Sequence, residues 1–136
     1  MKKDSVKKLD RLADAELDIM RVLWQADGCL KASEIVKCLS ETRSWKTQTA
    51  HVLLKRLEDK GFVTADKSAY VHTYVYAVGE GDYFASESDS LFKRIGGSFK
   101  TLVASMIDTD DITAEELSEL SEILEKKRAE LENKGK

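Results

Sequence analysis

The stretch WKTQTAHVLLKRLEDKG, residues 45–61, decides the fold, because it predicts one helix with an apolar face and an unusual polar face. At about 100° per residue, four aliphatic side chains fall on one stripe that can face a core. They are Ala50, Leu53, Leu54 and Leu57. The opposite face begins with short hydroxyl, amide and imidazole side chains, which can reach base edges and phosphates in a DNA major groove. The stretch therefore predicts a DNA-reading helix.

Most of the candidate DNA contacts lie on this polar face. They are Thr47, Gln48, Thr49, His51, Val52 and Lys55. Ser33 and Lys46 stand at predicted helix starts, where a hydroxyl and backbone N–H groups can hold a phosphate. Lys67 lies in a predicted turn and is a further candidate phosphate contact. The alternative is an ordinary solvated helix face that binds nothing.

The elements around the reading helix predict a winged helix-turn-helix. Residues 12–26 and 32–42 carry apolar side chains at helical spacing, and Gly61 can end the third helix. The next segment, 62–78, is dense in Val, Tyr and Thr and predicts two strands joined by a turn at 66–68. In a winged helix-turn-helix the third helix enters the major groove, and we expect the hairpin to lie along the DNA backbone. The order of elements therefore predicts a DNA-binding domain at residues 10–78.

The second half predicts three more helices, at 82–95, at 99–107 and after a capping box formed by Thr113 and Glu116. Their apolar stripes have few residues to enclose them, so a second copy of the chain is the expected cover. The candidate dimerisation residues are Phe92, Ile95, Leu102, Met106, Leu117, Leu120, Ile123 and Leu124. The alternative is a helical tail packed on the first half. We expect a mainly α protein (an α+β winged helix followed by a helical dimerisation domain at 79–136).

Composition and charge are consistent with this division. The chain has 136 residues, no proline and a net charge of −3. Residues 1–78 hold 14 Lys and Arg against 11 Asp and Glu, whereas residues 79–136 hold 8 against 14. A mildly basic half joined to an acidic half suits a nucleic-acid module with an appendage, although chance scatter would also produce it. The N-terminus lacks the apolar core of a signal peptide and no run could span a membrane, so we expect a cytoplasmic protein.

The pattern of reactive side chains argues against metal binding, cofactors and catalysis. Cys29 and Cys38 do not form a disulfide framework and are expected to be free thiols. With His51 and His72 they lack the close pairs of a zinc site, so no metal is expected. No phosphate loop, G-x-S-x-G or H-E-x-x-H motif occurs, and two histidines offer little acid–base chemistry. We expect neither an enzyme nor a cofactor.

Almost the whole chain resembles the BlaI/MecI/CopY (penicillinase repressor) family. The resemblance rests on segments that occur in the family's order, namely AELDIMRVLW (15–24), ASEIVKCL (32–39), WKTQT (45–49), L-x-x-L-x-x-K-G (54–61), GGSFKTLV (96–103) and ITAEELSELSEIL (112–124). Members are dimeric winged-helix repressors that occupy short inverted repeats, commonly with ACA/TGT half-sites. The resemblance implies a homodimer that binds double-stranded DNA and represses transcription.

The family contains two kinds of release, and the chain departs from both. The copper branch binds metal through C-terminal cysteines, and the C-terminus KKRAELENKGK has none. In the beta-lactam branch, a sensor-pathway protease leads to a cut between Asn and Phe in the dimerisation region. The aligned pair here is Ser105 and Met106, which marks the candidate cleavage region. Proteolysis, a ligand in the second half and oxidation of Cys29 or Cys38 all remain candidate signals.

Two further departures concern the DNA-binding half. His51 and Val52 stand where members often carry Arg and Thr, so we expect the operator to differ from the family's usual one. Ala13 and Lys31 replace residues that often cap helices, and Asp14 and Ser33 are expected to take over as caps. The hypothesis of a different class is a winged-helix protein–protein interaction module that uses the same face.

Overall fold

The computed structural model describes residues 8–135, which divide into two compact units at Leu91 and Phe92. In the first unit the helices are α1 (Asp14–Gln25), α2 (Ala32–Cys38), α3 (Thr47–Asp59) and most of α4 (Glu80–Arg94). The sequence placed the division between residues 78 and 79. The structural division lies later because Tyr83 and Ser86, in α4, are buried in the first unit.

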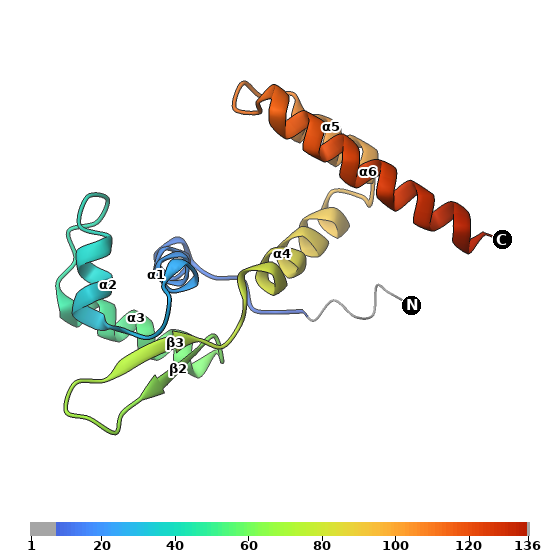
Figure 1. Cartoon of the computed structure of the whole chain (residues 1–136). Coiled ribbons are helices and arrows are strands. Elements are labelled where there is room, and N and C mark those ends of the chain that lie inside the picture. The colour runs from blue at the N-terminus through green and yellow to red at the C-terminus, as the bar shows by residue number, and fades with distance from the viewer. Residues whose placement is uncertain (1–7, 136) are drawn as a thin grey trace. The chain divides into compact units, whose positions relative to one another are not determined.

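The first unit also contains a three-stranded antiparallel sheet with strand order β1-β3-β2, in which β1 lies between α1 and α2 and the other two strands follow α3. The strands are β1 (Leu30–Lys31), β2 (Val63–Asp66) and β3 (Thr73–Tyr76). In the register, Val63 lies opposite Tyr76 and Asp66 lies opposite Thr73. Figure 1 shows this hairpin beside α3, so the predicted winged helix-turn-helix is confirmed. The strand β1 was not predicted, because two residues are too short to show a period.

The core of the first unit is formed where α1, α2 and α3 meet the sheet. Its buried side chains come from every one of these elements and from α4. The largest of those with less than 2% exposure are Phe62, Ile19, Met20, Leu23, Ile35, Leu54 and Leu57. Phe62 lies between the end of α3 and the hairpin, and the centroid of its ring lies 5.7 Å from that of Tyr83. Buried residues of α3 and of the hairpin belong to the same cluster, so the reading helix and the wing share one core.

Two helices begin in ways that the sequence did not predict. The N-caps of α1 and α2 are Ala13 and Lys31, neither of which makes a side-chain cap bond. Instead the carboxylates of Glu16 and Glu34 accept hydrogen bonds from these two backbone N–H groups, at 2.9 Å and 2.7 Å. The expectation that Asp14 and Ser33 replace the lost caps was wrong. A glutamate one turn into the helix satisfies the same kind of donor.

Two expected boundaries in the first unit were also wrong. The helix predicted at 32–42 ends at Cys38, because Leu39 leaves the helical conformation and the N–H of Arg43 folds back on its carbonyl at 2.8 Å. The turn predicted at 66–68 is the start of a longer loop, residues 67–72. Asp66 opens this loop by accepting hydrogen bonds from the N–H and hydroxyl of Ser68 at 3.0 Å and 2.6 Å.

The second unit contains the end of α4, α5 (Phe99–Ile107) and α6 (Ala114–Lys134). The predicted capping box at the start of α6 is present: Thr113 Oγ1 accepts from the N–H of Glu116 at 3.1 Å, and the carboxylate of Glu116 accepts from the N–H of Thr113 at 3.0 Å. None of the described residues from 92 to 135 is buried. This unit therefore has no core of its own within the chain.

Within residues 8–135, no helix combines the length and the apolarity that a membrane span needs. In the same part of the chain, no three His, Cys, Asp or Glu side chains gather as metal ligands would. Cys29 and Cys38 are both exposed free thiols.

Candidate nucleic-acid interface

The helix α3 has one buried face and one exposed face, as its sequence predicted. Ala50, Leu54 and Leu57 have 0% exposure, and Leu53 has 8%. The predicted contact residues of α3 are all exposed, namely Thr47, Gln48, Thr49, His51, Val52 and Lys55. The fold therefore presents these side chains together on one surface.

The first turn of α3 leaves backbone donors available. Lys46 is the N-cap and makes no side-chain cap bond. Its carbonyl accepts from the N–H groups of Thr49 and Ala50, at 3.0 Å and 3.4 Å. The N–H groups of Thr47 and Gln48 precede these first intrahelical bonds, as at any helix start. Such donors, together with the Lys46 ammonium, suit a phosphate group.

The turn that leads into α3 is held by a contact to α1. Arg43 Nε donates to Asp18 Oδ2 at 2.6 Å, and the guanidinium lies 5.1 Å from the centre of the Trp45 ring. This places a charge-assisted bond and a cation–π contact next to the first turn of the reading helix. Sequence reasoning missed Arg43, because its partner lies 25 positions away.

The other end of α3 is held by a partly buried ion pair. Lys60 Nζ donates to both carboxylate oxygens of Glu16, at 2.9 Å and 3.1 Å, and Glu16 is only 2% exposed. Burial raises the pKa of this carboxyl group, but the hydrogen bonds from Lys60 and from the N–H of Ala13, with the nearby cationic charge, outweigh burial and lower the pKa. The pair joins α1 to the C-terminal end of α3.

Two predicted phosphate contacts have acidic partners within the protein. Lys67 Nζ lies 3.2 Å from the carboxylate of Glu58, and Lys55 Nζ lies 3.3 Å from that of Asp59. Both lysines are at least half exposed, so these are weak surface pairs that a phosphate can replace. Ser33 is exposed on α2 and is not at the N-cap position.

The predicted dimerisation residues lie in the second unit or at its edge, and all are at least partly exposed. Exposure reaches 62% for Met106 and 63% for Ile123. Leu102, Leu120 and Phe92 are half-buried. The candidate cleavage residues, Ser105 and Met106, lie inside α5, where the Ser105 hydroxyl donates to the carbonyl of Leu102 at 2.9 Å.

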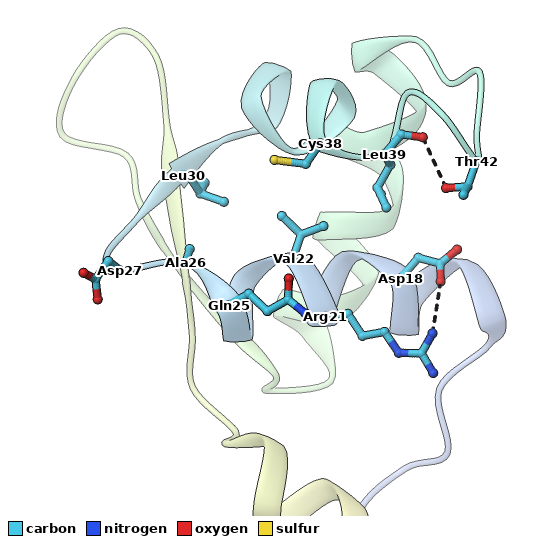
Figure 2. A pocket seen from close by; sticks show the side chains of 10 residues that line it. All are labelled: Asp18, Arg21, Val22, Gln25, Ala26, Asp27, Leu30, Cys38, Leu39 and Thr42. Atoms are coloured by element: carbon cyan, nitrogen blue, oxygen red, sulfur yellow. Dashed lines mark hydrogen bonds and ion pairs between the residues drawn. The ribbon is translucent and has the colours of Figure 1, made fainter. Parts of the chain in front are cut away.

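A pocket opens between α1, α2 and β1 (Figure 2). Val22, Leu30 and Leu39 supply its apolar side chains, and Cys38 lies on its wall. At its rim the guanidinium of Arg21 lies 3.9 Å from Asp18, the residue that also holds Arg43. Sequence reasoning did not predict this pocket, since its lining comes from three separate segments.

Comparison with known proteins places this geometry in a family. A family model described as penicillinase repressor matches residues 12–126. The penicillinase repressor of Bacillus licheniformis is 33% identical over 121 residues, covering 88% of this chain and 94% of the relative. The methicillin resistance regulatory protein MecI of Mammaliicoccus sciuri is 28% identical, covering 88% and 98%. The solution structure of the DNA-binding domain of the repressor BlaI aligns with a TM-score of 0.48 and 35% identity, covering 57% of this chain and 93% of that domain.

Proposed function

This chain belongs to the penicillinase repressor family and is a DNA-binding transcriptional repressor, and we propose that it occupies an inverted-repeat operator as a homodimer until a signal releases it. The observation that carries the proposal is the exposed polar face of α3. In a helix-turn-helix protein, residues near the start of the recognition helix contact base edges. We place this action in the cytoplasm, where the repressor would meet its operator.

Different side chains of the DNA-binding surface would contact different parts of the operator. Gln48 can bond adenine through its N6 and N7 edge, and the methyl groups of Val52 can pack on the methyl group of thymine. His51 offers an imidazole in place of a bidentate arginine, which changes the base that this position favours. Thr47, Thr49 and Lys55 complete the base-side surface of the helix. Ser33, Lys46 and Lys67 would contact phosphates and fix the orientation of the domain.

Dimerisation through the second unit would bring together two DNA-binding domains, one from each chain. The unit has no buried residue among those described, and apolar side chains remain exposed along α5 and α6. A second copy would cover this surface and remove it from water. Two DNA-binding domains related by a twofold axis match an operator with two half-sites.

Release would act on the same second unit. A protease acts on an extended segment, so a cut between Ser105 and Met106 requires α5 to unwind. The described side chains of α5 include none that is buried, which makes local opening easy. A cut there would separate α6 from the DNA-binding half, and a sensor-pathway protease is the partner that this step would need.

The test is fluorescence anisotropy with the promoter of the protein's own gene and with a shuffled duplex, each at two salt concentrations. We expect tighter binding to the promoter, and a loss of about 1–3 kcal/mol in binding free energy for Gln48→Ala. Gln25→Ala is the matched control, because Gln25 is an exposed glutamine on α1 outside the proposed surface.

The same titration distinguishes the repressor from a protein-binding module. Phosphate contacts release counterions, so the log–log dependence on salt should have a slope of about −0.9 for each phosphate neutralised. Equal, weak binding to both duplexes would contradict specific operator binding. It would instead favour a winged helix that binds another protein through α3.

A further inference from the structure

The tip of the wing carries an aromatic side chain with no contact to the rest of the protein. Tyr70 is 100% exposed, and its neighbour Val71 is 48% exposed. Both lie in the loop between β2 and β3, which projects past the strands in Figure 1. A fully exposed tyrosine stabilises nothing within the chain. Its ring is available to a partner, and aromatic rings contribute most when they are buried in a contact.

The residues between Lys67 and His72, at the tip of the wing, carry no cation that could hold a phosphate. The one cation of loop 67–72 besides a histidine is Lys67, whose ammonium pairs with Glu58. The carboxylate of Asp66 accepts two hydrogen bonds from Ser68, which lower its pKa and keep it ionised at the base of the loop. The outermost residues are therefore uncharged and apolar. They suit the sugar and base edges of a groove better than a phosphate.

The wing is also tied to α3, the helix that carries the proposed DNA surface. The Lys67–Glu58 pair, at 3.2 Å, joins the start of the loop to α3, and Phe62 fixes the base of the hairpin in the core. A loop of this length reaches about 10 Å beyond its strands, at about 3.3 Å per residue. With α3 in the major groove, such a reach carries the tip across one phosphate backbone to the neighbouring minor groove.

We propose that Tyr70 and Val71 enter the minor groove beside each half-site and act there as an apolar wedge that adds sequence preference. This proposal rests on the proposed operator binding. Apolar side chains that enter a minor groove widen it and partly unstack a base step. Flexible pyrimidine–purine steps deform most easily, so the wedge favours TA or CA steps in the flank of the half-site.

The experiment compares the full-length protein with Tyr70→Ala and Tyr70→Phe on operator duplexes with a TA or a GC step at the flanking position. Tyr70→Ala should weaken binding to the TA duplex about tenfold and abolish the preference between the two duplexes. Tyr70→Phe keeps the ring and should remain within about threefold of the wild type. Neither change removes a charge, so the salt slope should stay the same. The control is Tyr76→Ala, at the base of the hairpin, where the side chain is 42% exposed.

A second measurement tests directly whether the protein contacts the minor groove. Dimethyl sulfate methylates adenine N3, an atom of the minor groove. Bound wild-type protein should protect this atom in the flank, and Tyr70→Ala should restore its reactivity while protection of the half-site persists. If Tyr70→Ala binds the operator as tightly as the wild type and still protects the flank, the wedge proposal is wrong. A protein partner would then be the occupant of the tip. Absence of specific binding by the wild type would instead refute the proposed function itself.

Discussion

Lys60→Met tests whether the ion pair at the end of α3 holds the reading helix on α1. The variant keeps most of the apolar stem but removes the ammonium, which lies 2.9 Å and 3.1 Å from the oxygens of Glu16. A hydrogen bond to a charged group contributes about 1.5–3 kcal/mol. The Lys60 side chain is 30% exposed, so solvent weakens the pair, whereas the Glu16 side chain is 3% exposed. We expect the free energy of unfolding to fall by about 2 kcal/mol at pH 7.

The loss should depend on pH, and the sign follows from the lowered pKa of Glu16. Its folded pKa lies below the ordinary value of 4.5, because the Lys60 and Ala13 hydrogen bonds outweigh burial. A group of this kind stabilises the fold above its unfolded pKa and loses that contribution as the pH falls through the folded pKa. In Lys60→Met, only the hydrogen bond from Ala13 and the charge of Arg56 still oppose burial, so the pKa of the Glu16 carboxyl group rises relative to the wild type. The difference between wild type and variant should therefore shrink below a pH of about 4.5.

Urea denaturation at pH 7 and at pH 4, followed by tryptophan fluorescence, measures this difference. Lys55→Met is the matched control, because its ion pair with Asp59 has side chains 65% and 63% exposed and should contribute less than about 0.5 kcal/mol. Two results would refute the reasoning: a loss in Lys60→Met no larger than in the control, or a loss of equal size at both pH values.

Three further changes probe other parts of the first unit. Trp24→Phe removes the 2.9 Å hydrogen bond from the indole N–H to the carbonyl of Val78 and should cost about 1 kcal/mol of stability in the same denaturation assay; an unchanged midpoint would contradict this. Gly61→Ala places a side chain at φ +84°, which should cost about 1–2 kcal/mol although no atom lies within 4 Å of the added carbon; a more stable variant would argue against the left-handed turn. Asp18→Asn weakens the bond to Arg43 and should speed amide hydrogen exchange in residues 39–46 while leaving exchange in the hairpin unchanged.

The features that sequence predicted correctly are those encoded in residues close together in the chain. The apolar stripe of α3 recurs at helical spacing, and its members are buried as expected. The capping box of Thr113 and Glu116 is encoded within four residues and is present. Local patterns of this kind are read directly from neighbouring residues, because each helix or cap depends on them alone.

The features that sequence could not predict depend on residues that are distant in the chain. Glu16 and Lys60 are separated by 44 positions, and neither belongs to a pattern that names the other. Lys67 pairs with Glu58, nine positions away, and the turn pattern around Lys67 does not name that partner. Only the tertiary structure brings such charges together, so the sequence could not predict the Arg43–Asp18 and Lys60–Glu16 pairs that hold the two ends of α3.

The most direct test of the central claim is the stoichiometry and footprint of the complex with operator DNA. Light scattering should give two chains per duplex, and the footprint should show two protected half-sites related by a dyad, about 10 base pairs apart centre to centre. Leu124→Glu, on the exposed apolar face of α6, should reduce the stoichiometry at equal protein concentration while leaving the helix-turn-helix folded. One chain on an isolated half-site, or protection without any sequence preference, would contradict a dimeric operator-specific repressor.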